Sequence, residues 1–145
     1  MSKAETISLD SSKEVSDMWE NYKQICFIAP SAPPEWDYYA IITAWNPGSL
    51  PLPQEQNEGR HRSLRERVGH FPSQEVWGSA PDRSWQEFSL AVACPLPLAL
   101  SLAEEFGQNA LYWVEKGELF LLPVRLRHEG ESLGRIAHCW IADAN

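Results

Sequence analysis

Residues 38–45, Tyr-Tyr-Ala-Ile-Ile-Thr-Ala-Trp, carry the strongest strand pattern in the chain. β-branched and aromatic side chains favour the extended conformation. The almost unbroken apolar character of the segment predicts a central strand that is buried on both faces of its sheet. Asn46-Pro47-Gly48 follows at once and ends the strand, because Pro and Gly interrupt regular structure. The rest of the domain is therefore expected to be arranged around this strand.

Three segments have helical patterns. Ser11 is predicted to cap a first helix over about residues 13–24, with Glu14 completing a capping box. Asn57 is predicted to cap a second helix that runs to about residue 68. After Pro97, apolar residues at helical spacing predict a third helix that ends before Gly107, a residue type that favours the left-handed conformation found after helix ends.

Further strands are predicted on both sides of the central one. The segment 25–29 is a short strand or an extended tail before a proline-bearing loop, and 75–79 and 85–94 are strands joined by a turn. Two more, 110–114 and 119–124, flank the turn 115–118, and a last strand is expected over about residues 135–141.

This order of elements defines the expected fold class. From residue 38 it is strand, helix, strand, strand, helix, strand, the order of the ferredoxin-like split βαβ fold, an α+β class with a mainly antiparallel sheet and two covering helices. An N-terminal helix and one or more extra C-terminal strands are added to it. We expect residues 1–35 to form a helix and loop packed on a single domain, 36–145. Eight residues are predicted to be in the core: Ile41, Ile42, Leu90, Val92, Leu102, Phe106, Leu111 and Leu121.

Composition and charge exclude several functional classes. The chain has 145 residues, 12 Lys+Arg against 20 Asp+Glu, and a net charge of −8. Nucleic acid and anionic membranes are unfavourable partners for so acidic a domain. The N-terminus has no signal-peptide pattern and the chain has no long apolar run, so a cytoplasmic location is expected. The three cysteines have no zinc spacing and are expected to be reduced, and neither a metal nor another cofactor is predicted.

Four short motifs occur in a fixed order. They are Ile41-Ile-Thr-Ala-Trp-Asn-Pro47, Asn57-Glu-Gly-Arg60, Gly78 with Pro81-Asp82 and Trp85-Gln-Glu87, and Phe106-Gly-Gln-Asn-Ala110. The set resembles the bacterial family catalogued as domain of unknown function 3293, over roughly residues 36–124. The resemblance implies a bacterial cytosolic domain, and it implies no reaction because the family has no assigned activity.

The polar residues of these motifs lie at the ends of predicted elements. The first turn of a helix beside an arginine favours an anion, through its free N–H groups and the helix dipole. Glu87 shares a strand face with Trp85, where an apolar ring favours a raised pKa. We predict a ligand-binding site formed by Asn46, Asn57, Arg60, His61, Trp85, Glu87, Gln108 and Asn109, in which Arg60 pairs with Glu87. The alternative is that these residues are independent caps, turn formers and structural partners.

Three functions fit this pattern. The first is a non-catalytic module that binds a polar or anionic small molecule or a partner protein. The second is a hydrolase- or transferase-like enzyme that uses Glu87 with Arg60 and His61. The third is an accessory protein that meets nucleic acid through the arginine-rich helix 60–67. The oligomeric state is not predicted.

Overall fold

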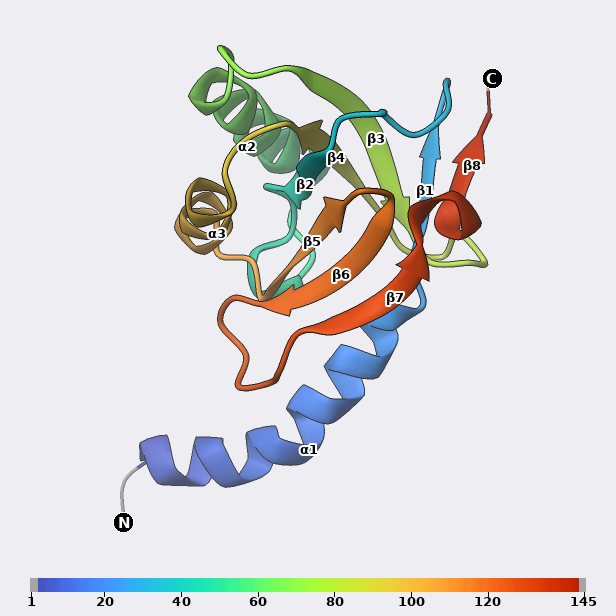
Figure 1. Cartoon of the computed structure of the whole chain (residues 1–145). Helices are drawn as coiled ribbons and strands as arrows, with labels where there is room; N and C mark the ends of the chain where they lie inside the picture. The colour runs from blue at the N-terminus through green and yellow to red at the C-terminus, as the bar shows by residue number, and fades with distance from the viewer. Residues whose placement is uncertain (1–2, 144–145) are drawn as a thin grey trace.

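The structure, a computed structural model, describes residues 3–143 and the side chains of residues 13–143 (Figure 1). It has three α-helices and eight strands. In chain order the elements are α1 (Lys3–Lys23), β1 (Cys26–Ala29), β2 (Tyr38–Thr43), the 3₁₀ turn η1 (Pro47–Ser49), α2 (Gln54–Arg67), β3 (Ser73–Ser79), β4 (Gln86–Val92), α3 (Leu96–Glu105), β5 (Ala110–Glu115), β6 (Glu118–Pro123), β7 (Glu131–Arg135), η2 (Ile136–Cys139) and β8 (Trp140–Ala142).

All eight strands belong to one sheet, in the order β7-β6-β5-β2-β4-β3-β1-β8. Neighbouring strands are antiparallel except for β1 and β8, which are parallel. β2 lies in the middle, between β4 and β5, as its sequence predicts. The predicted α+β class with a mainly antiparallel sheet is therefore confirmed. β1 is hydrogen-bonded into this sheet although it lies in the segment 1–35, and the domain boundary near residue 35 stays a prediction.

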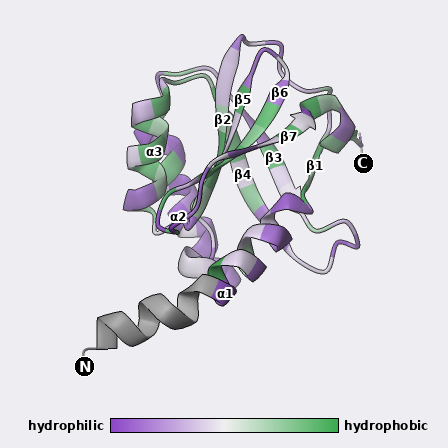
Figure 2. Ribbon diagram, turned by 60° about the horizontal axis from the view of Figure 1, so that its bottom comes forward, coloured by the Kyte–Doolittle hydropathy of each residue, from purple (hydrophilic) through white to green (hydrophobic). Residues whose placement is uncertain are grey.

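α2 and α3 cover one face of the sheet (Figure 1). Most of α2 is hydrophilic, whereas α3 is mainly hydrophobic up to the two glutamates at its C-terminal end (Figure 2). α2 contributes Leu64 to the core, and Val68 follows as the residue that ends the helix; both are fully buried. α3 contributes three residues, Ala99, Leu102 and Ala103. These side chains pack on alternate residues of the central strands and form the larger hydrophobic core.

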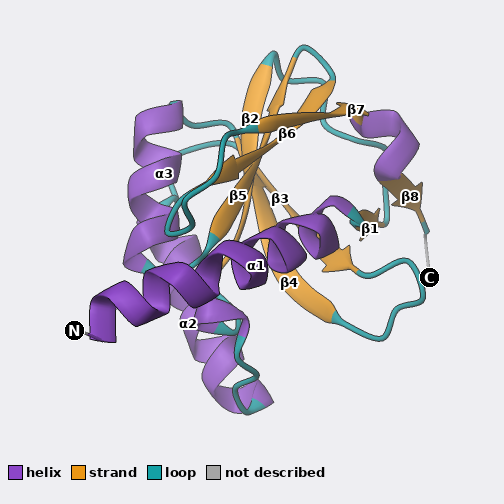
Figure 3. Cartoon of the chain, turned by 90° about the horizontal axis from the view of Figure 1, so that it is seen from below, coloured by secondary structure: helices purple, strands orange, loops and turns teal. Residues whose placement is uncertain are grey.

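The opposite face is concave because the sheet curls (Figure 1). β6 and β7 bend round from one side, and the chain continues through η2 into β8 on the other side. A second core therefore forms inside the curl, where Phe27, Ile136 and Trp140 pack with residues of the central strands. Seen from below, α1 crosses one end of the sheet (Figure 3). Its Trp19 is fully buried, stacks on His128 and donates a hydrogen bond to Glu131.

The predicted core and several predicted turns are confirmed. All eight predicted core residues are buried. Gly107 has a φ of 73°, and the N–H groups of Gly107 and Gln108 bond back to the carbonyls of Glu104 and Ala103, which closes the end of α3 as a Schellman motif. β5 and β6 are joined through Lys116 and Gly117, both with positive φ, at the predicted turn.

The predicted starts of two helices are wrong. α1 begins at Lys3, so Ser11 lies inside the helix and not at its N-cap. α2 begins at Gln54, directly after Pro53, because proline fixes φ near the helical value and needs no hydrogen-bond acceptor at this position. Asn57 therefore lies in the first turn of α2, and its side chain is used elsewhere.

The predicted strand 135–141 is also wrong, because this segment is divided. β7 ends at Arg135, η2 turns the chain, and β8 begins at Trp140. β7 pairs with β6 while β8 pairs with β1, at opposite edges of the sheet. One straight strand cannot reach both edges, so the chain must turn between them.

None of the helices in residues 3–143 has the length and apolar character needed to cross a membrane.

The core assignment predicts the effect of truncating α3. Leu102 has an exposed fraction of 1%, so Leu102→Ala should lower the free energy of unfolding by about 2–5 kcal/mol through lost burial and the cavity left behind. Leu50→Ala is the matched control, because Leu50 is 69% exposed. Urea denaturation measures both variants, and equal midpoints would show that α3 does not pack as described.

Candidate functional site

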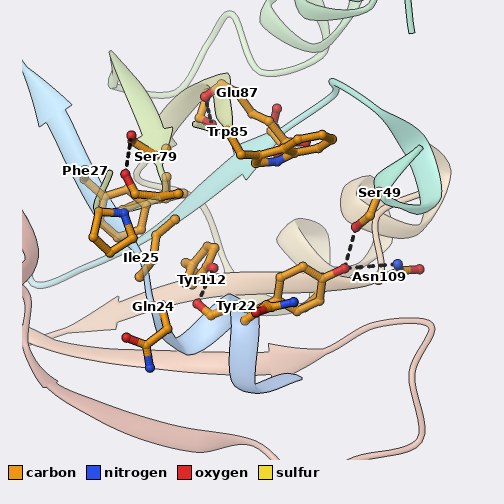
Figure 4. Close-up of a pocket in the computed structure, with 18 of the residues that line it drawn as sticks. Tyr22, Gln24, Ile25, Phe27, Ser49, Ser79, Trp85, Glu87, Asn109 and Tyr112 are labelled. Atoms are coloured by element: carbon orange, nitrogen blue, oxygen red, sulfur yellow. Dashed lines mark hydrogen bonds between the residues drawn. The ribbon is translucent and has the colours of Figure 1, made fainter. Parts of the chain in front are cut away.

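A cavity of about 720 Å³ opens on the concave face of the sheet, between the central strands and the end of α1 (Figure 4). Alternate residues of a strand face the same side of a sheet, so each central strand sends two side chains into this space. These six residues are Ile41, Thr43, Glu87, Ser89, Ala110 and Tyr112. The volume is in the range of small-molecule sites in other proteins.

The C-terminal end of α1 is fastened over the cavity by Tyr22. The Tyr22 hydroxyl is hydrogen-bonded to Ser49 and accepts a hydrogen bond from the Asn109 amide at 3.1 Å (Figure 4). The Tyr112 hydroxyl donates to the backbone carbonyl of Tyr22 at 2.7 Å. Side chains from β5 and from two loops therefore hold this helix end in place, and α1 becomes one wall of the site.

Glu87 is the only acidic side chain that the strands contribute to the wall among residues 13–143. Its Oε2 accepts a hydrogen bond from the Asn46 amide at 3.0 Å. Burial raises the pKa of Glu87 from 4.5 to about 7, although hydrogen bonds from Asn46 and Trp85 favour the ionised form and limit the rise. The carboxyl group therefore changes charge near neutral pH.

Asn46 and Asn57 form a buried junction behind Glu87. The Asn57 side-chain oxygen accepts from the Asn46 backbone N–H at 3.0 Å, and the Asn57 amide donates to the Asn46 side-chain oxygen at 2.8 Å. The same Asn46 oxygen also accepts from the backbone N–H of Leu52. Asn46 adopts the left-handed conformation, with φ of 47°, which Asn tolerates better than most residues. The junction turns the chain after β2 and directs the Asn46 amide at Glu87.

Arg60 does not pair with Glu87 as predicted. Its Nε donates to the carbonyl of Ala44 at 2.6 Å, and its Nη2 donates to the carbonyl of Phe106. The guanidinium also lies over the Phe106 ring, 5.7 Å from its centre. Arg60 thus joins the end of β2 to the end of α3, and its donors satisfy carbonyl groups that the strand and the helix leave free.

His61 lies on the other side of the sheet from Glu87. Its ring packs on Phe88, which follows Glu87 in β4 and points to the opposite face. Its Nε2 is 3.3 Å from the Glu75 carboxylate, and its Nδ1 has no hydrogen-bond partner. Burial lowers the pKa of His61, although Glu75 favours its charged form. His61 is therefore separated from the cavity.

Trp85, Gln108 and Asn109 reach the cavity together with Glu87. Trp85 is 40% exposed and lies next to Glu87 (Figure 4). Gln108 is buried and donates from its amide nitrogen to the carbonyls of Trp45 and Phe106. Of the eight predicted residues, four therefore line the cavity. Asn46 and Asn57 support Glu87 from behind, and Arg60 and His61 have other partners.

The prediction missed the residues that close the cavity. Tyr22 comes from α1, which was interpreted as a packed N-terminal helix, and Phe27 comes from β1. Strand alternation could have identified Thr43 and Tyr112. Thr43 is two residues after Ile41 in β2, which pairs with the strand of Glu87, and Tyr112 is two residues after Ala110 in β5, which pairs with β2. The helical spacing of Met18, Trp19 and Tyr22 indicates a packed face of α1, but it does not show that this face borders a cavity.

Three of the four arginines predicted to face a phosphate have partners. Arg60 binds the two carbonyls, Arg65 pairs with Glu75, and Arg67 pairs with Glu105. Arg62 alone is exposed and without a partner in the part of the chain that is described. In residues 13–143, no group of three or more His, Cys, Asp or Glu side chains is placed to hold a metal ion. The absence of a metal or another cofactor stays a prediction.

Comparison with known proteins supports the family resemblance. Residues 42–111 match the sequence model of the family described as protein of unknown function (DUF3293). The match includes the last two residues of β2, all of α2, β3, β4 and α3, and the start of β5. The predicted resemblance to this family is thus confirmed. No curated protein and no solved structure gives a significant match.

The contacts of Arg60 predict that its main role is structural. Arg60→Ala should lower the free energy of unfolding by about 1–3 kcal/mol, because it leaves two carbonyls without their charged donor. Arg62→Ala, which removes an exposed arginine without a partner from the same helix, is the matched control and should change stability by less than about 0.5 kcal/mol. Chemical denaturation compares them, and a stable Arg60→Ala protein would contradict the role.

The raised pKa of Glu87 predicts a pH-dependent stability. Because the pKa is higher in the folded state than the usual 4.5, ionisation of Glu87 opposes folding, and this cost appears as pH rises from about 4.5 through 7. Once Glu87 is fully ionised in the folded protein, this cost to the free energy of unfolding is up to about 3 kcal/mol. Glu87→Gln should therefore match wild type at pH 5 and exceed it in stability at pH 8. Asp82→Asn is the control, because hydrogen bonds from Ser84 lower the pKa of this exposed carboxyl. Parallel pH dependences in wild type and Glu87→Gln would refute the assignment.

Proposed function

We propose that the protein binds a polar small molecule, without catalysis, in the cavity on the concave face. The observation that supports this proposal best is the placement of Glu87. A partly buried carboxyl group stands on the wall of a cavity of about 720 Å³ and is oriented from behind by Asn46. Binding sites combine a mostly apolar lining with a few oriented polar groups. Ile41, Phe27 and Trp85 give the apolar part here, and Glu87 gives the oriented group.

We further propose that the unit from β2 to β5 is a ferredoxin-like split βαβ domain. The strand order β5-β2-β4-β3 and the two helices on one face support it. In this interpretation the strands β6, β7, β1 and β8 are additions that curl the sheet and enclose the face that the helices leave uncovered. The bacterial origin and the cytoplasmic location remain proposals that rest on the sequence.

Catalysis is the second candidate function, and one observation favours it. A carboxyl group with a pKa of about 7 in a cavity is suited to act as a general acid or base. The two residues predicted to assist Glu87 have other partners. Arg60 binds the carbonyls of Ala44 and Phe106, and His61 contacts Glu75. Catalysis would therefore depend on Glu87 alone. A partner-protein role and a nucleic-acid role have no comparable supporting observation in the described residues.

A ligand screen tests the binding proposal. Ligands that bind only the folded protein raise its melting temperature, so a hit in a thermal-shift screen of polar fragments is expected for wild type. Ala110→Phe should abolish the shift, because Ala110 is on the cavity wall and the larger ring would fill the space. Ser101→Phe is the control, since Ser101 is exposed on α3, on the other face of the sheet.

The result is interpreted by comparing the two variants. Hits that persist in Ala110→Phe would place binding outside the cavity and contradict the proposal. Hits that are lost in both variants would indicate a general effect of an added ring on folding. Loss in Ala110→Phe alone, with both variants folded by circular dichroism, is the expected outcome.

A further inference from the structure

The hydroxyl groups around the cavity have little donor capacity left for a ligand. Thr43 donates to the carbonyl of Phe88, Ser89 to that of Glu87, and Tyr112 to that of Tyr22. Ser79 likewise donates to the carbonyl of Ala80. A hydroxyl group has a single hydrogen, so each of these groups offers a ligand only lone pairs.

The buried amide of Gln108 is used in the same way. Its nitrogen has two hydrogens and donates to two backbone carbonyls, those of Trp45 and Phe106. The Asn109 amide donates to the Tyr22 hydroxyl. The side-chain oxygens of both residues have no partner among residues 13–143 and are acceptors. The wall is therefore rich in acceptors.

The charges on the wall have one sign. Glu87 and Asp82 are acidic, and none of the Lys, Arg or His residues in the described part of the chain lines the cavity. Asn46 and Trp85 occupy two of the lone-pair positions of the Glu87 carboxylate. A carboxylate has about four such positions, so Glu87 can accept further hydrogen bonds from a ligand. An anionic ligand would meet repulsion from both carboxyl groups here, although the amides of Asn21, Gln24 and Asn109 keep free hydrogens at this cavity.

Trp85 adds a planar surface beside these acceptors. It is 40% exposed, it lines the cavity, and it lies next to Glu87 (Figure 4). The face of an indole ring attracts cations and stacks with planar groups. A flat, positively charged group would thus contact both the ring and the carboxylate.

From these observations we infer that the cavity binds a planar nitrogen cation of the amidinium or guanidinium class, with its N–H groups directed at Glu87. The inference rests on the proposed binding function and names its ligand chemistry. Two parallel N–H donors match a carboxylate in the way that arginine matches carboxylates within proteins. The side-chain oxygens of Gln108 and Asn109 accept from polar substituents of the ligand, and the ligand's apolar part contacts Phe27 and Ile41.

Binding of such a cation depends on the ionisation of Glu87. A carboxyl with a pKa of about 7 is mostly neutral at pH 6 and mostly ionised at pH 8. The other titratable groups on this wall are Asp82, Tyr22 and Tyr112. Hydrogen bonds from Ser84 lower the pKa of Asp82, and burial raises that of Tyr112 well above 10, so neither changes charge in this range.

Three probes of nearly equal shape test the inference: benzamidine, a cation; benzamide, which is neutral; and benzoate, an anion. Isothermal titration calorimetry or tryptophan fluorescence gives their affinities for the full chain. At pH 8, benzamidine should bind at least tenfold more tightly than either of the others. Its affinity should fall about tenfold between pH 8 and pH 6, because the ionised fraction of Glu87 falls by that factor.

Glu87→Gln keeps the size of the side chain and removes its charge. It should weaken benzamidine binding at least tenfold at pH 8 and remove the pH dependence. Asp82→Asn, which removes an exposed acidic group at the same cavity, should change the affinity by no more than about threefold and keep the pH dependence.

The outcomes separate the ligand class from the binding function. If benzamide or benzoate binds as tightly as benzamidine, or if Glu87→Gln keeps the pH dependence, the inferred class is wrong while the cavity remains a binding site. If none of the three probes binds at millimolar concentration and Ala110→Phe changes no fragment hit, both the class and the proposed function are overturned. If benzamidine binds equally to Ala110→Phe, it binds outside the cavity and the inference fails.

Discussion

The buried pair of amides formed by Asn46 and Asn57 is the contact on which the arrangement of the site depends. Asn46 lies three residues after the end of β2, the central strand, and Asn57 lies in the first turn of α2. Two hydrogen bonds between them, of 2.8 and 3.0 Å, fix the entry of the helix against the end of the strand. Because both residues are almost fully buried, losing either would leave polar groups without partners, at a cost of about 1–3 kcal/mol each. Neither bond uses the Asn46 side-chain NH₂, which donates to Glu87 instead.

The two faces of the sheet have different tasks. On the helical face, Leu64, Leu102 and other apolar side chains fill the space between the strands and the helices and form the larger of the two cores. On the concave face the added strands curl over the sheet without filling it, and α1 closes one side. Burial on the first face stabilises the strands, so the second face can keep a cavity lined by Thr43, Ser89 and Glu87.

Local patterns predicted the central part of the fold. The apolar run of β2, the helical spacing in α3, and the glycines at 107 and 117 each act through near neighbours, and these elements form as expected. The roles of Arg60 and Asn57 were not predicted, because their partners are distant in the chain. Arg60 binds carbonyl groups 16 and 46 residues away, and Asn57 binds Asn46, which is 11 residues away. The C-terminal segment failed for a similar reason, since β8 pairs with β1 over a separation that no local pattern records. Of the candidate site, Glu87 and Trp85 were found because strand alternation is local, whereas the wall formed by α1 was not.

A purely structural role for Glu87 is difficult to reconcile with its surroundings. Structural carboxylates are normally paired with a cation or hold several donors, which lowers their pKa and makes ionisation favourable. Glu87 has two donors, no paired Lys, Arg or His among residues 13–143, and a pKa raised to about 7 by burial. Near neutral pH the folded chain therefore retains a carboxyl group whose ionisation opposes folding. Such a group is expected where a site is adapted to a ligand, because a donor that binds there removes the same penalty that the free protein carries. Asn46 and Trp85 together still leave the charge of Glu87 without a partner of opposite sign.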